Sequence, residues 1–242
     1  MDNLFNRFHT LVQTRINYLQ DFCAFGEDSI RYDFYYALMQ QYNLLPHQII
    51  LEQAIPKSQY IQKERNLIEL KQGRHEDKPE FDLRVDGTNN LQNGLLCEFA
   101  FFRNPLIGKL DVSGAYGKIL NEIHRLALLK HYRNIPNLDG YKDFSKYKCL
   151  MVCITDSGML EYGNGKRGRK PAYLVQDRYK LDDQFLSPPL ANVIIDAVDA
   201  RFRMKAMQLK IIPTAERIYN RVENFEESKW GIWIWEVDYI SR

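Results

Sequence analysis

The stretch GLLCEFAFF, residues 94–102, is a strong strand candidate, and the expected fold is built outward from it. A single acid, Glu98, interrupts its apolar run. Because side chains alternate faces along a strand, Glu98 lies on the same face as Ala100 and Phe102. A carboxylate among large apolar groups is costly to bury unless it binds a cation or hydrogen-bond donors. The stretch therefore predicts a strand that carries a candidate functional residue.

Hydrophobic periodicity on either side of this strand predicts both helices and further strands. Helical spacing is found at 3–23, at 28–42 with Asp28 or Ser29 as its cap, at 115–131, and at 191–225 with an interruption at Pro213. A short helix is also expected within the charged segment 57–78. Strand patterns occupy 47–54, 80–86, 147–155 and 231–238. This order predicts an α/β architecture, a mixed sheet flanked by helices.

Composition indicates one folded domain. The 242 residues are 45% hydrophobic and 26% charged, which excludes a disordered chain. The net charge of +2 neither requires nor excludes a nucleic-acid partner. Acids outnumber bases over residues 1–100, and bases outnumber acids over 101–242, which is compatible with an acidic site on a basic surface.

Nothing in the sequence directs secretion or membrane insertion. No apolar run reaches the roughly 18 residues of a membrane span, so a cytoplasmic protein without a membrane partner is expected. The four cysteines form no CxxC pair, and Cys97, Cys149 and Cys153 lie in apolar runs. Reduced, buried thiols are therefore expected rather than disulfides or a zinc site.

A second acid lies 16 residues before Glu98 on a neighbouring expected strand. Asp82 alternates with Phe81 and Leu83, so it is expected on the opposite face from both. Asp82 and Glu98 are then placed to converge at one edge of the sheet. Two carboxylates at one place favour a metal ion, and hard oxygen ligands suit Mg²⁺, which can also bind a substrate phosphate.

These residues resemble the PD-(D/E)xK, or restriction-endonuclease-like, nucleases. The resemblance is carried by PEFD at 79–82 and CEFAFFR at 97–103, and by the order of the expected elements. It covers roughly half the chain and implies an αβββαβ core over about 27–155. The remaining residues, about 156–242, are then C-terminal basic additions of helix and strand within a single nuclease domain, 1–242.

The resemblance also implies a catalytic site. Asp82 and Glu98 would hold Mg²⁺, which activates water and stabilises the charge on an attacked phosphodiester. Glu27, before the first core helix, and Glu52, on the first core strand, match positions where such folds supply a further carboxylate. The sequence does not decide between them, and the alternative for each is an exposed acid at the end of an element.

Ala100 departs from the family pattern, which has lysine at this position. That lysine positions the nucleophilic water and offsets phosphate charge, so its loss is expected to reduce hydrolysis strongly. Three interpretations are open. The chain is a naturally degenerate nuclease; the lysine has moved, with Lys109 and Lys118 as candidates and Arg103 as a substitute cation; or Ala100 is an introduced inactivating substitution. The third interpretation is favoured, because EFAFFR resembles EFKFFR with only that position truncated.

A basic loop at 163–171 is the candidate DNA contact. It places four cations among glycines, namely Lys166, Arg167, Arg169 and Lys170. Basic loops of this kind bind phosphates or enter a narrow groove of DNA. Arg103 and Lys118 are added to this set. The alternative is a solvated hairpin loop. The tryptophan-rich segment 230–235 is interpreted as a core or dimer strand, and no histidine is assigned a catalytic role.

Together these residues predict a Mg²⁺-dependent DNA endonuclease, a homodimer whose two sites cut both strands of a duplex. A site-specific type II restriction enzyme is the leading subtype, with an active site impaired by Ala100. Two alternatives remain open: a catalytically dead nuclease fold that binds DNA or regulates, and a nuclease acting on RNA or branched DNA. The target sequence cannot be read from these residues.

Overall fold

The computed structural model describes most of the chain: residues 1–19, 26–54, 80–103, 112–131, 143–156, 160, 176–183, 185, 198, 200–225 and 228–242. Its described helices are α1 (Asp2–Leu19), α2 (Glu27–Tyr42), α4 (Val112–His131) and α7 (Ala200–Gln208), with a 3₁₀ turn, η2 (Pro46–Gln48). Its described strands are β1 (Ile49–Ala54), β2 (Glu80–Val85), β3 (Leu95–Phe102), β4 (Lys148–Asp156), β5 (Arg178–Lys180), β6 (Ile211–Phe225) and β7 (Ser228–Ser241).

The strands form one open mixed sheet in the order β1-β2-β3-β4-β7-β6-β5. Strands β1, β2 and β3 are antiparallel neighbours, whereas β3 and β4 run parallel. A parallel pair needs a crossover connection, and α4 lies between these two strands in the chain. The C-terminal strand β7 pairs antiparallel with β4, so the chain's last element is part of the central sheet.

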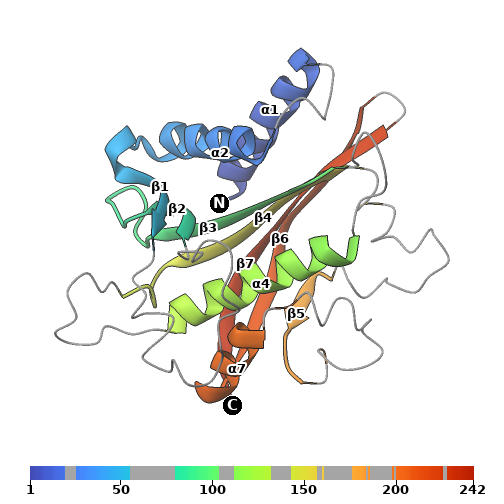
Figure 1. Cartoon of the computed structure of the whole chain (residues 1–242). Helices are drawn as coiled ribbons and strands as arrows, with labels where there is room; N and C mark the ends of the chain where they lie inside the picture. Colours follow the sequence, from blue (N-terminus) through green and yellow to red (C-terminus); the bar gives the residue numbers. More distant parts are fainter. Residues whose placement is uncertain are drawn as a thin grey trace.

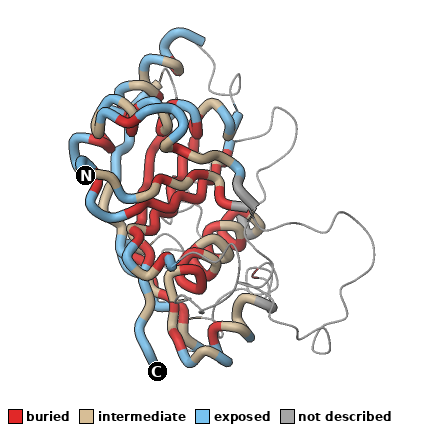
Figure 2. Tube along the Cα trace, turned by 90° about the vertical axis from the view of Figure 1, so that its left-hand side faces the viewer, coloured by how far each residue is buried: buried red, intermediate tan, exposed pale blue. Residues whose placement is uncertain are grey.

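Helices cover both faces of the sheet (Figure 1). Helices α1 and α2 pack on one face over a cluster that includes Phe34, Leu83 and Phe99, and α4 covers the other over a cluster that includes Ala100 and Cys153. Figure 2 shows the buried strands as the band between these layers. The expected α/β architecture, a mixed sheet flanked by helices, is confirmed.

The expected helical stretch over 191–225 is wrong in its second half. Helix α7 ends at Gln208, and residues 211–225 form β6, which pairs with β7 along its length. Its first five residues alternate between buried and half-buried, the period of a strand, and Pro213 lies near the strand's beginning, where a missing N–H is tolerated. The last strand is also longer than the expected 231–238.

Smaller differences occur at the ends of other elements. Helix α2 begins at Glu27 with Gly26 as its N-cap and has no side-chain cap, so the expected cap at Asp28 or Ser29 is wrong. Three cysteines are buried free thiols, as expected: Cys97, Cys149 and Cys153. The helix expected within 57–78 lies outside the described residues. No described helix combines the length and apolar character needed to cross a membrane.

Candidate functional site

Strands β2 and β3 pair only where Leu83–Val85 lie opposite Leu95–Cys97. Further along β3, carboxylate side chains accept the hydrogen bonds of its open edge. The N–H of Phe99 donates to Oδ2 of Asp82 at 2.7 Å. The N–H of Phe101 donates to Oε2 of Glu27 at 3.3 Å. Backbone donors that a strand partner would normally satisfy are thus bonded to side chains from β2 and α2. The irregularity in the sheet therefore positions two of the candidate acids.

The alternation of faces along β2 breaks at the same place. Leu83 packs on the α1–α2 side, but Phe81 packs on the α4 side, so the expectation that they share a face is wrong. Opposite the break, Glu52 is skipped in the register between β1 and β2 and has a left-handed backbone with φ 50°. This conformation is uncommon for a residue other than glycine, and it accompanies the local change of direction.

Glu98 lies at the base of the site with an exposed fraction of 0%. Its Oε2 forms an ion pair with Nη2 of Arg125, which also contacts Glu122 at 2.6 Å. Burial raises the pKa of Glu98 well above its usual value; Arg125 opposes this rise, and the charge of Glu122 and the charge and hydrogen bond of Asp82 add to it. Asp82 and Glu98 are therefore close enough for the carboxylate of Asp82 to act directly on that of Glu98.

Arg31 on α2 is the main counter-ion on the other side of Asp82. Its Nη2 lies 3.2 Å from Oδ1 of Asp82 and 3.5 Å from Oε1 of Glu27, and its Nη1 lies 2.6 Å from Oε1 of Glu52 and 3.2 Å from Oδ1 of Asp28. One guanidinium thus connects carboxylates from α2, β1 and β2. Its side chain is only 10% exposed, so these contacts are partly shielded from water.

Lys118 on α4 completes the group. Its Nζ lies 2.7 Å from Oε2 of Glu27. The connected side chains are here called the carboxylate cluster. It comprises the acids Glu27, Asp28, Glu52, Asp82, Glu98 and Glu122 and the cations Arg31, Lys118 and Arg125. Six acids against three cations leave a formal charge of −3 when all are ionised, which favours uptake of a cation.

The residues present fit Mg²⁺ in two respects. The donors are carboxylate oxygens, and Oε1 of the fully buried Glu98 receives no hydrogen bond from any described residue. Within the described residues, no three or more His, Cys, Asp or Glu side chains lie close enough to hold one ion together. The fit is therefore to an ion held by two carboxylates, Asp82 and Glu98, that keeps several waters, as Mg²⁺ commonly does.

The other sequence-predicted residues fall into three groups. Glu27 and Lys118 belong to the cluster beside Asp82, and Glu52 reaches it through Arg31. Arg103 follows β3, is exposed and has its guanidinium 5.9 Å from the ring centre of Phe101. Ala100 is 1% exposed and packs on the α4 side of the sheet. Four cations and one alternative lysine lie outside the described residues: Lys166, Arg167, Arg169, Lys170 and Lys109.

Sequence reasoning missed four members of the cluster: Asp28, which was named only as a helix cap, and Arg31, Glu122 and Arg125. A signal for two of them was present. Lys118, Glu122 and Arg125 are spaced four and three residues apart, so they share one face of α4. A charged stripe on a helix that must also cover a sheet indicates a polar site between the two. Arg31 gave no comparable signal, because its role depends on contacts with distant strands.

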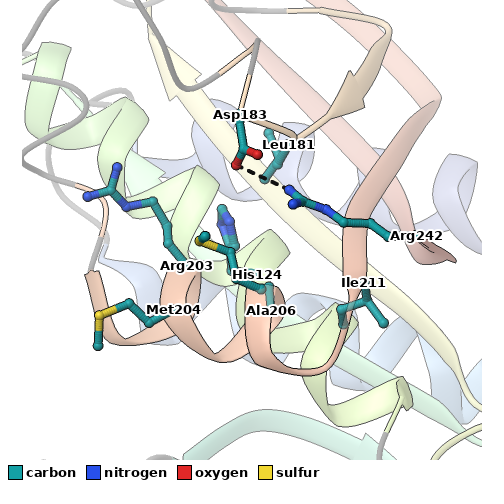
Figure 3. Close-up of a pocket in the computed structure, with 9 residues that line it drawn as sticks. His124, Leu181, Asp183, Arg203, Met204, Ala206, Ile211 and Arg242 are labelled. Atoms are coloured by element: carbon teal, nitrogen blue, oxygen red, sulfur yellow. Dashed lines mark hydrogen bonds and ion pairs between the residues drawn. The ribbon is translucent and has the colours of Figure 1, made fainter. Parts of the chain in front are cut away.

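A separate pocket lies beside α7 and contains no such convergence of acids (Figure 3). It has a volume of about 280 Å³ and is lined by residues of α4, α7 and β6, by Leu181 and Asp183 just after β5, and by Arg242. Its carboxylate, Asp183, is 3.1 Å from Nη2 of Arg242 and is thereby neutralised. His124 lies at its base and Arg203 at its side. The carboxylate cluster is therefore the stronger candidate site.

His124 predicts an acid-sensitive fold. Burial lowers its pKa from 6.5 to about 4, although its Nδ1 lies 2.8 Å from the carbonyl oxygen of Leu120. The unfolded chain binds a proton at His124 near pH 6.5, and the folded chain binds it only near pH 4. The contribution of the neutral imidazole to folding stability is therefore fully present above pH 6.5 and is lost as the pH falls toward 4. Wild type should lose roughly 3 kcal/mol more than His124→Gln across this range in denaturant titrations. Parallel losses in both proteins would contradict the prediction.

No protein-family model, curated protein or solved structure matches the chain. Function is therefore inferred from the geometry and charge of the carboxylate cluster.

Proposed function

We propose that the protein is a Mg²⁺-dependent endonuclease that hydrolyses phosphodiester bonds in duplex DNA. One observation carries the proposal: Glu98 is completely buried beside Asp82, and its Oε1 has no described hydrogen-bond donor. A fully buried carboxylate next to a partly buried one, in a cluster with a negative surplus, is stabilised by a divalent cation. Glu98 therefore has a chemical reason to occupy an otherwise apolar strand.

The order of the elements supports a restriction-endonuclease-like core. The chain runs α2, β1, β2, β3, α4 and β4, the αβββαβ order that the resemblance implies. Asp82 lies on the second of these strands and Glu98 on the third. The type II restriction subtype and a homodimer with two sites follow from this resemblance and are parts of the proposal.

The chain's own residues have distinct roles in this mechanism. Asp82 and Glu98 would hold Mg²⁺, which when bound would lower the pKa of a water and offset charge on the phosphate. Arg125, fixed by Glu122, orients Glu98, and the N–H of Phe99 orients Asp82. Arg31 limits repulsion among the remaining acids. The cluster is thus arranged before substrate binds, which is favourable for electrostatic stabilisation of developing charge.

A specific observation favours a second candidate, a catalytically dead fold that binds DNA or regulates. Ala100 faces α4 two residues after Glu98, and its methyl side chain cannot supply the cation that the resemblance places there. A metal site without such a cation binds but hydrolyses poorly. This candidate predicts metal and DNA binding without cleavage.

Cleavage and calorimetry together test the endonuclease proposal. Wild type should bind Mg²⁺ and cut mixed-sequence duplex DNA, and a chelator should stop the reaction. Asp82→Asn should lower the rate by about 10² to 10³-fold or more, because it removes a charged ligand at the reacting centre. The matched control is Asp33→Asn, since Asp33 is a carboxylate of low exposure that pairs with Arg15 outside the cluster. Metal binding without cleavage of DNA or RNA, even by Ala100→Lys, would favour the second candidate.

Salt dependence tests the proposed DNA contact at 166–170. Each phosphate contact contributes about 0.9 to the slope of log affinity against log salt concentration. Replacing Lys166, Arg167, Arg169 and Lys170 by serine should therefore flatten the slope, measured by fluorescence anisotropy with a duplex oligonucleotide. Replacing Lys205 and Lys210, which lie on α7 and just after it, provides a comparison. An unchanged slope in the variant of residues 166–170 would show that these cations do not contact DNA phosphates.

A further inference from the structure

We propose that Lys118 of α4 supplies the substrate-contacting cation of this site, in the place where Ala100 leaves none. This inference rests on the proposed endonuclease function and identifies which residue meets the phosphate. Of the three interpretations of Ala100, it selects the relocated lysine.

The position of Lys118 is fixed along β3 by two hydrogen bonds. Asp82 accepts from the N–H of Phe99, and Glu27, which binds Nζ of Lys118, accepts from the N–H of Phe101. Two residues along a strand span about 6 to 7 Å. Measured along β3, the carboxylate of Asp82 is therefore at the level of residue 99, and the ammonium of Lys118 is near residues 100 and 101, closer to Phe102.

Cys153 lies at the same level on the neighbouring strand. It is the register partner of Ala100 on β4. Burial raises the pKa of its thiol; the charge of Lys118 opposes this rise and the charge of Glu27 adds to it. The Lys118–Glu27 pair is thus close to the Ala100–Cys153 pair of the sheet.

Exposure distinguishes Lys118 from the other two cations of the cluster. The side chain of Lys118 is 40% exposed, compared with 10% for Arg31 and 17% for Arg125. Arg31 is engaged by four carboxylates and Arg125 by two. Lys118 has one described carboxylate partner, and Glu27 retains the N–H of Phe101 when the ammonium turns to a substrate. Lys118 is therefore the cluster cation that a phosphate arriving from solvent can contact.

The chemical step assigned to Lys118 is electrostatic. In hydrolysis, a water oxygen bonds to phosphorus while the bond from phosphorus to the leaving sugar oxygen breaks. The water loses a proton to solvent, and the leaving oxygen takes one up. Negative charge on the phosphate oxygens grows during this exchange, and an ammonium that is already in position stabilises it without forming a covalent bond.

A helix-matched pair of variants tests this role. Lys118→Met should lower the rate of Mg²⁺-dependent DNA cleavage by about 10² to 10³-fold. Mg²⁺ affinity, measured by calorimetry, should be unchanged or higher, because a nearby positive charge has been removed. Lys130→Met is the control, since Lys130 lies on the same helix and pairs with Asp238 at 3.0 Å. It should cleave at the wild-type rate. Adding Ala100→Lys to Lys118→Met should restore part of the activity.

The outcomes separate this inference from the endonuclease proposal. Equal cleavage by wild type and Lys118→Met would overturn the role of Lys118 and leave the endonuclease intact. If Lys118→Met lost Mg²⁺ binding as well as cleavage, the role of Lys118 would also be overturned, because the residue would then be a structural partner of Glu27. Cleavage by Ala100→Lys but not by wild type would show that the strand lysine is required and that Lys118 does not replace it. If no protein cuts any substrate, the endonuclease proposal fails and Lys118 loses its role with it.

Discussion

Replacing Glu98 by glutamine should abolish most Mg²⁺ binding and at the same time stabilise the metal-free protein at neutral pH. The affinity should fall by about 100-fold or more, because even partners behind a metal ligand contribute about 10 to 100-fold. The stability of the metal-free protein should rise at neutral pH, because burial and the neighbouring acids make the charged form of Glu98 unfavourable in the folded protein. Arg125 keeps Glu122 at 2.6 Å and is not left without a counter-ion.

The pH dependence of this gain follows from the raised pKa of Glu98, which burial causes and neighbouring acids reinforce. A raised folded-state pKa gives stability that is present below the unfolded value of about 4.5 and is lost as the pH rises through the folded value. The advantage of Glu98→Gln should therefore grow with pH in denaturant titrations. Glu122→Gln, which removes the other partner of Arg125, should retain metal binding. An unchanged Mg²⁺ affinity in Glu98→Gln would exclude Glu98 as a ligand.

Local sequence patterns predicted the strands that carry the site but not its network. The run at 94–102 became β3 because it is apolar on both faces, as a strand covered by helices must be. Residues 211–225 were expected to be helical because their cations and apolar residues permit several periods. Pairing with β7 decides in favour of a strand, and that contact is distant in sequence.

The geometry around Asp82 also lay beyond local patterns. The open edge of β3 arises because β2 pairs with it only from Leu83 to Val85, and no residue type marks where this pairing begins. Arg31 was missed because its importance comes from carboxylates on three elements that meet only in the fold. The role inferred for Lys118 likewise depends on how α4 crosses the sheet. Sequence reasoning could name this lysine only as one of several alternatives.

Replacing Arg31 by methionine should produce the largest loss of stability among the cluster variants, and Mg²⁺ should reverse part of it. Its guanidinium lies within 3.5 Å of four carboxylates. Removing one partner of a fully buried ion pair costs about 3 to 5 kcal/mol, and the loss here should lie at or below that range because Asp28 and Glu52 are mostly exposed. A ligand that binds only the folded state restores about 2.7 kcal/mol at 100 times its dissociation constant. Added Mg²⁺ should therefore raise the melting temperature of Arg31→Met more than that of wild type.

The comparison that isolates this effect is Arg15→Met. Arg15 bonds both carboxylate oxygens of Asp33, at 2.6 and 2.7 Å, in a partly buried pair between α1 and α2 that includes no residue of the cluster. Its loss should also destabilise the protein, but the response to Mg²⁺ should equal that of wild type, since Asp82 and Glu98 are unchanged. If Mg²⁺ stabilises Arg31→Met no more than wild type, the guanidinium and the metal do not compete for Asp82. The ion would then bind away from the acids that Arg31 holds together.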